Sequence, residues 1–257
     1  MRWLGSALVA VLLLAGCGDD ESAASSRDVT DGGRHRSVTV LAAASLTDAF
    51  TELAAEFEAA EPGISVELSF GSSSSLREQI LGGAPADVFA SANRSNMAAV
   101  VDAGLARDPE VFATNQLQLA VPSDNPGDVD GLEDLADPDL LIGLCAEEVP
   151  CGEFGRQVLA AAGVTPSIDT NAPDVRALLT QLESGDLDAG IVYETDVLAS
   201  GDAVVGIDIP AADNVVAAYP IAALTDAGDM DAAQAFVAFV RSARGQPILT
   251  SFGFGSP

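Results

Sequence analysis

The chain has 257 residues, of which 48% are hydrophobic and only 5% aromatic, and this length suffices for one large domain or two lobes. Its 39 acidic residues against 11 basic ones give a formal net charge of −28, which argues against nucleic acid as a partner. Most of the carboxylates are expected on a solvated surface, because the sequence contains no acidic loop of the calcium-binding type.

The first residues have the features of a secretion signal. Arg2 precedes an apolar run that ends in small residues and is too short for a stable membrane span. Its ending, LAGC, resembles the lipobox of bacterial lipoproteins, in which the cysteine becomes the new N-terminus and carries the lipid. We therefore predict a signal peptide over residues 1–16, lipidation of Cys17, and a flexible tether over residues 17–36. The alternative for Cys17 is an ordinary buried cysteine.

The single histidine, His35, falls within this tether. Ser-His-Asp and Cys-His catalysis need an imidazole held beside the nucleophile, and zinc sites depend on the same kinds of ligand. A serine hydrolase would have to use a carboxylate as its general base, because the chain has no lysine either. We therefore expect no enzymatic activity and no cofactor, and a secreted serine hydrolase is the weaker alternative.

Two cysteines remain once Cys17 carries the lipid, and they lie six residues apart at Cys145 and Cys151. An even pair in an oxidising compartment predicts a disulfide bond, with two reduced, buried thiols as the alternative. Such a bridge would either position the loop between the cysteines or merely stabilise the fold.

From residue 37 onward, short apolar runs alternate with segments of helical periodicity. In chain order the pattern predicts a strand at 37–42, a helix at 46–60, a strand at 64–70, helix 75–83, strand 86–91, helix 94–104, strands 116–122 and 140–145, helices 152–162 and 174–184, strands 188–193 and 218–224, and helix 229–243. Repeated βα units imply parallel sheets covered by helices on both faces, with ligands at the carboxyl ends of the strands. The pattern fits one large sheet or two smaller lobes equally well.

Serines occupy two of the predicted strand-to-helix junctions. Ser45 follows the first strand, and its spacing to Asp48 matches a capping box, whereas FGSSSSL places Ser72 to Ser75 before the second helix. The first amides of a helix lack internal partners and carry the positive end of its dipole, so hydroxyls beside them can complete an anion cradle. The alternative for Ser45 is an ordinary N-cap. Periodic segments flank the serine run immediately, which excludes a flexible linker.

Several segments together resemble the periplasmic molybdate-binding proteins that feed ABC transporters. In order, they are VTVLAAASLTDAF, SFGSSSSLREQILGGAPADVFASA, NQLQLAVP, VPCGEFG, APDVRALL and DAGIVYETD, within residues 37–257. The resemblance implies an α/β fold of the two-lobed, type II periplasmic-binding-protein class, in which each lobe is a mainly parallel sheet flanked by helices. Lobe 1 would comprise residues 37–118 and 219–257, and lobe 2 residues 119–218.

The resemblance also implies a ligand set, carried over residue by residue. It comprises Ser45, Ser73, Cys151, Val175 and Tyr193, with Cys151 and Val175 acting through their backbone amides. Because four serines are adjacent, the second position is uncertain by one residue. The family commonly has alanine where this chain has Cys151, and a backbone amide survives that difference. Two nearby arginines, Arg77 and Arg176, are interpreted as surface residues.

A fully deprotonated dianion offers only hydrogen-bond acceptors, so a pocket of hydroxyl and amide donors without a carboxylate accepts it and rejects a protonated phosphate. The resemblance implies a monomeric receptor, and the LAGC ending predicts that it is lipid-anchored on the outer face of the cytoplasmic membrane. It would bind molybdate, and tungstate as well, and deliver them to an ABC permease. The alternative is a receptor for sulfate, phosphate or a ferric complex. Ferric sites usually use paired tyrosines, and the chain has only Tyr193 and Tyr219.

Overall fold

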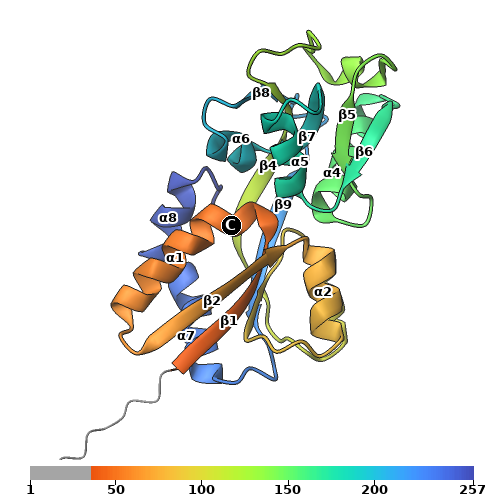
Figure 1. Ribbon diagram of the computed structural model, residues 1–257. Helices are drawn as coiled ribbons and strands as arrows, with labels where there is room; N and C mark the ends of the chain where they lie inside the picture. Colours follow the sequence, from red (N-terminus) through yellow and green to blue (C-terminus); the bar gives the residue numbers. More distant parts are fainter. Residues whose placement is uncertain (1–35) are drawn as a thin grey trace, which may run out of the picture. The chain divides into compact units, whose positions relative to one another are not determined.

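The computed structural model describes residues 36–257 as an α/β fold (Figure 1). The predicted signal peptide, the lipidation site Cys17 and the tether up to His35 lie outside the described residues. The strands are β1 (Arg36–Ala43), β2 (Ile64–Gly71), β3 (Val88–Ala90), β4 (Glu110–Pro122), β5 (Ile142–Cys145), β6 (Ile168–Ala172), β7 (Ala189–Tyr193), β8 (Val204–Asp208) and β9 (Val216–Ala223).

Helices separate most of these strands. They are α1 (Thr47–Ala60), α2 (Ser73–Leu81), α3 (Arg94–Asp102), α4 (Pro150–Ala162), α5 (Val175–Glu183), α6 (Glu194–Ala199), α7 (Met230–Val240) and α8 (Gly245–Ser251), with 3₁₀ turns at Ala44–Leu46 and Leu132–Ala136. Within residues 36–257, no helix is long and apolar enough to cross a membrane. The alternation of strands and helices agrees with the α/β class predicted from periodicity.

The strands follow the order β2-β1-β3-β9-β4-β7-β5-β6, and β8 also pairs with β4. The pairs β1–β2, β1–β3, β5–β6 and β5–β7 are parallel, as expected for βα units. All four pairs that involve β4 or β9 are antiparallel, so the predicted parallel pairing holds only for the strand pairs that involve neither of them. The reason is that β4 carries the chain away from the first strands and β9 brings it back in the opposite direction.

Strand β4 belongs to two sets of strands. Its residues 110–116 pair with β9, whereas residues 117–122 pair with β7 or β8. We call β1, β2, β3 and β9 with α1, α2, α3, α7 and α8 the β1 half, and β5 to β8 with α4 to α6 the β5 half. The sequence predicted only the second part of β4, because a register shift after Val111 buries both Phe112 and Ala113 and breaks the period-two pattern.

Helices cover both faces of the β1 half (Figure 1). Val40 and Ala42 on one face of β1 belong to the core cluster that includes Phe50 of α1 and Phe236 of α7. Their neighbour Leu41 points to the other face and packs in a second cluster with residues of α2 and α3. Because both faces are buried, β1 is apolar without interruption from residue 40 to its last residue, 43, as expected for a central parallel strand.

Candidate ligand-binding site

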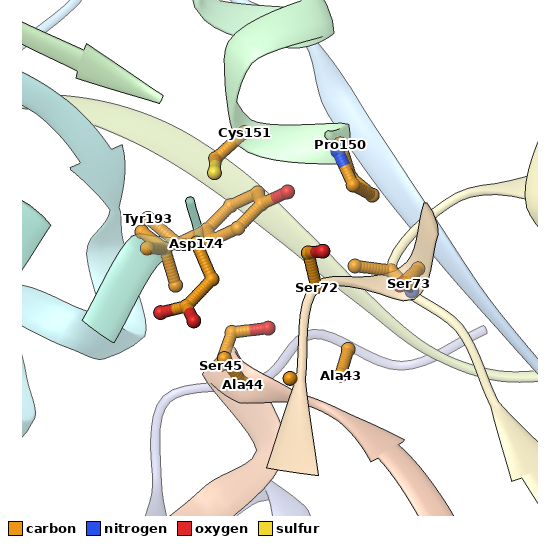
Figure 2. Close-up of a pocket in the computed structure, with 12 residues that line it drawn as sticks. Ala43, Ala44, Ser45, Ser72, Ser73, Pro150, Cys151, Asp174 and Tyr193 are labelled. Atoms are coloured by element: carbon orange, nitrogen blue, oxygen red, sulfur yellow. Dashed lines mark hydrogen bonds between the residues drawn. The ribbon is translucent and has the colours of Figure 1, made fainter. Parts of the chain in front are cut away.

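All five residues of the predicted ligand set line one small, open cavity of about 20 Å³ (Figure 2). The full lining is Ala43, Ala44, Ser45, Gly71, Ser72, Ser73, Ala92, Pro150, Cys151, Asp174, Val175 and Tyr193. The 3₁₀ turn after β1 and the first residues of α2, α4 and α5 all contribute to it. Four helical N-termini therefore meet at one place, and the cavity is polarised for an anion although no lining residue is basic.

Ser45 sits in the 3₁₀ turn Ala44–Leu46, ahead of α1, and is 5% exposed. The predicted capping box is wrong, because the N-cap of α1 is Leu46 and makes no side-chain cap. The inserted turn moves Ser45 out of the capping position. Its hydroxyl instead lies 2.9 Å from the hydroxyl oxygen of Tyr219, which is a buried residue of β9.

The four-serine run divides into residues with different partners. Ser72 is the N-cap of α2 and accepts a hydrogen bond from the Ser75 amide at 3.2 Å. The Ser73 hydroxyl oxygen accepts a hydrogen bond from the Ala92 amide at 2.9 Å, which leaves its hydrogen available to the cavity. Ser74 and Ser75 do not line this cavity. The geometry thus reduces the candidates from four serines to two and favours Ser73 as the donor.

Cys151 lies in the first turn of α4, which begins at Pro150. Its sulfur atom is 2.07 Å from that of Cys145, in agreement with the predicted disulfide bond. The Arg156 guanidinium also holds this segment, because it donates to the carbonyl oxygens of Cys145 at 2.8 Å and Gly152 at 3.1 Å. A covalent bond and two hydrogen bonds therefore set where the start of α4 meets the cavity.

The one charged residue of the lining, Asp174, was not predicted. Asp174 is the N-cap of α5, and its carboxylate accepts a hydrogen bond from the Ala177 amide at 2.9 Å. The expectation of a cavity without a carboxylate is therefore wrong. One carboxylate oxygen of Asp174 is therefore used in a hydrogen bond to its own helix. The cap does not involve the amide of Val175, which lies at the first position of α5.

Tyr193 ends β7 with a side chain that is 1% exposed. Its hydroxyl is directed into the cavity, between Cys151 and the serines (Figure 2), and has no hydrogen-bond partner among the described residues. Burial raises the pKa of Tyr193 well above its ordinary value, so the hydroxyl stays neutral and can donate. A buried hydroxyl without a partner is costly, and a bound acceptor would remove that cost.

The chain matches the family described as bacterial extracellular solute-binding proteins over residues 38–255. It belongs to this family. The solute-binding protein is 38% identical over 263 residues to the molybdate-binding protein ModA of Mycobacterium tuberculosis, with 100% of both chains covered. It is also 30% identical to YvgL, a putative ABC transporter substrate-binding lipoprotein of Bacillus subtilis, over 97% of this chain and 95% of that one.

Among solved structures, the periplasmic molybdate-binding protein of Azotobacter vinelandii has a TM-score of 0.77 to this chain at 24% sequence identity. The match covers 86% of this solute-binding protein and 99% of the Azotobacter chain. The family assigns the chain to binding proteins and not to enzymes, which confirms that prediction. The structural match confirms the predicted fold class of the periplasmic binding proteins.

Three charged residues form a group behind the cavity of this solute-binding protein. Arg176, the second residue of α5, forms an ion pair with Asp48 of α1, and its Nε lies 3.6 Å from a carboxylate oxygen of Asp196. Asp196 is fully buried and accepts a hydrogen bond from the Tyr193 amide at 3.2 Å. The interpretation of Arg176 as a surface residue is incomplete, because this partly exposed side chain also connects segments that carry Ser45, Val175 and Tyr193.

The buried carboxyl group of Asp196 should make stability depend on pH. Burial raises its pKa from 3.8 to about 7, and the charge of Arg176 only partly opposes this effect. Between these pH values the folded protein keeps a proton that the unfolded chain releases. The free energy of unfolding should therefore fall, on the order of 4 kcal/mol, as pH rises from about 4 to about 7.

Asp196→Asn should remove this fall, because the amide does not titrate. Urea unfolding between pH 4 and pH 8 measures it, and Asp202→Asn, at an exposed position, is the matched control. An identical pH slope in wild type and Asp196→Asn would contradict the assignment.

Proposed function

We propose that this protein captures molybdate, and tungstate as well, and delivers it to an ABC permease. The observation that carries the proposal is the convergence of three hydroxyls and two helix starts on one cavity. The proposed ligands are the hydroxyls of Ser45, Ser73 and Tyr193 and the backbone amides of Cys151 and Val175. The relative in Mycobacterium tuberculosis, similar over the whole chain, is named a molybdate-binding protein.

The donor set suits a dianion that keeps no hydrogen of its own. Each donor to a charged oxygen contributes about 1.5–3 kcal/mol net, so several donors are needed to offset the loss of hydration. The carboxylate of Asp174 accepts from its own helix, and it would repel an anion placed against it. The anion is therefore expected where the three hydroxyls and the two amides converge, away from the Asp174 carboxylate.

We propose that the cavity closes between two lobes, residues 37–118 with 219–257 and residues 119–218. Ser45 and Ser73 come from the β1 half, whereas Cys151, Val175 and Tyr193 come from the β5 half. Two polar contacts also join these halves. They are the Asp48–Arg176 ion pair and a 2.8 Å hydrogen bond from Asn93 to the carboxylate of Glu153. Such contacts would favour the closed arrangement that surrounds the anion.

Asp48→Asn should speed molybdate dissociation by up to about fivefold, because a partly exposed ion pair contributes about 0.2–1 kcal/mol. Removing a negative charge near an anion would by itself slow dissociation, so an increase identifies the lost contact. Stopped-flow measurement of the dissociation rate checks this, with Glu52→Gln on the exposed face of α1 as control. An unchanged or slower rate in Asp48→Asn would exclude the ion pair as a closing contact.

We also propose that the protein is a monomer held on the outer face of the cytoplasmic membrane by a lipid on Cys17. The LAGC ending supports the anchor, and the Bacillus subtilis relative is named a lipoprotein. Labelled fatty acid should be incorporated into wild type and not into Cys17→Ser. Equal labelling of both proteins would refute the anchor.

Calorimetric titration tests the ligand. The chain from residue 34, titrated with molybdate, tungstate, sulfate and phosphate in turn, should bind the first two and discriminate against the others. Tight binding of sulfate or phosphate instead would favour the alternative oxyanion receptor. The absence of binding to all four anions would overturn the proposal.

A further inference from the structure

Tyr219 contacts Ser45 from behind the cavity and does not belong to its lining. Its side chain is fully buried, and its ring packs edge-on against the rings of Phe112, Tyr193 and Phe254, with centroids 5.5–6.3 Å apart. This packing holds the ring in one position. The hydroxyl lies 2.9 Å from the Ser45 oxygen, and either group could donate on distance alone.

Asn115 decides which group donates. Its side-chain oxygen accepts a hydrogen bond from the Gln116 backbone amide at 3.0 Å. A flip of the Asn115 side chain would place its NH₂ group against the Gln116 N–H, so that two donors would face each other, and the flipped orientation is therefore excluded. The nitrogen therefore faces the other way, 2.8 Å from the hydroxyl oxygen of Thr195 and 3.4 Å from that of Tyr219. Its two hydrogens serve these two oxygens.

The direction of the remaining bonds follows from this arrangement. The Tyr219 oxygen accepts from Asn115, and Ser45 supplies the one acceptor that lies within hydrogen-bond distance of the Tyr219 hydroxyl among the described residues. The Tyr219 hydrogen is therefore directed to the Ser45 oxygen. Burial raises the pKa of Tyr219, so this hydrogen stays in place at physiological pH. Ser45 then accepts from Tyr219, and its hydrogen is left for the cavity. In the opposite direction, Ser45 would present only lone pairs to a bound anion.

We propose that Asn115 and Tyr219 orient the Ser45 hydroxyl so that it only donates to the ligand, which makes Tyr219 a positioning residue for oxyanion selectivity. The proposal rests on the proposed function, because it concerns the same cavity. An oxyanion that carries a hydrogen, such as hydrogen phosphate, needs an acceptor, and Tyr219 occupies the acceptor side of Ser45. At Ser45, acceptor-only anions are therefore favoured.

Tyr219→Phe removes the donor and keeps the ring. In the full chain purified in detergent, we expect molybdate affinity to fall about tenfold and the preference for molybdate over phosphate at pH 6 to shrink. In the Ser45→Ala background, Tyr219→Phe should have no further effect on either quantity. This non-additivity is a readout that a merely structural role of Tyr219 would not produce, because general loosening would add to the effect of Ser45→Ala.

The possible outcomes separate the two proposals. Two outcomes would overturn the orienting role alone. In the first, Tyr219→Phe keeps the wild-type affinity and preference. In the second, Tyr219→Phe weakens the binding of all anions equally and does so in the Ser45→Ala background as well. If wild type bound sulfate and not molybdate, the named ligand would be wrong, and the same coupling measured with sulfate would still support the orienting role. A wild type that binds no oxyanion would overturn both. If Tyr219→Phe fails to fold, Asn115→Leu replaces it and should shift the preference in the same direction.

Discussion

Replacing Ser45 by alanine should weaken molybdate binding by ten- to a hundredfold. The hydroxyl is one donor to a charged oxygen, and its loss costs about 1.5–3 kcal/mol, which corresponds to a change of that size in the dissociation constant. The free energy of unfolding should change less. Ser45 caps no helix, and the main structural loss is one hydrogen bond to Tyr219.

Calorimetry and thermal melting of the same samples separate these two effects. Ser75→Ala is the matched control, because Ser75 belongs to the serine run at the start of α2, is exposed, and does not line the cavity. It should bind molybdate like wild type. A folded Ser45→Ala protein with an unchanged dissociation constant would remove Ser45 from the ligand set.

Gly152→Ala should abolish binding almost completely, by a hundredfold or more. A Cβ at this position would lie 1.8 Å from the carbonyl oxygen of Ala146 and 2.7 Å from that of Cys145. Both are backbone atoms and cannot rotate away, so the start of α4 must shift and carry the amide of Cys151 with it. Overpacking of this kind costs about 1–3 kcal/mol or more of the free energy of unfolding.

Gly155→Ala, one turn further along α4, should have the opposite effect on stability. A Cβ there would meet its nearest neighbours at 3.7–3.9 Å, which is ordinary contact distance. Alanine is preferred over glycine inside a helix by about 1 kcal/mol, so this variant should melt at or above the wild-type temperature and keep its affinity. Wild-type binding by Gly152→Ala would refute the close approach of α4 to the Ala146 loop.

Periodicity predicted the elements that are buried and regular, such as β1, α1 and β7. It missed β6, whose sequence IDTNA alternates half-buried with exposed side chains, because this strand lies at the end of the sheet order and buries little. The last helix, α8, contains a glycine and a proline that weaken the helical signal. Short edge elements depend on their neighbours more than on their own sequences.

The candidate site was predicted through motifs, and its supporting contacts were not. Ser45, Ser73 and Tyr193 lie in stretches that resemble a family, so their positions could be inferred from the sequence alone. Asp48 and Arg176 are 128 residues apart, and Ser45 and Tyr219 are 174 apart. No local pattern predicts such pairs. The capping-box prediction failed for a related reason, because a local spacing cannot reveal the 3₁₀ turn that precedes α1.

The shared strand β4 also determines the order in which the fold can be completed. The strands of the β5 half and its part of β4 lie within the contiguous residues 117–208, so short loops close that half. In the β1 half, β3 cannot pair with β9 until β9 is available, and the pairing residues of β9 follow those of β3 by more than a hundred positions. Closing the longer loop costs more chain entropy. The chain is synthesised from its N-terminus, so β9 becomes available late. The β1 half is therefore completed only after β9 has been synthesised, and so is the cavity that both halves line.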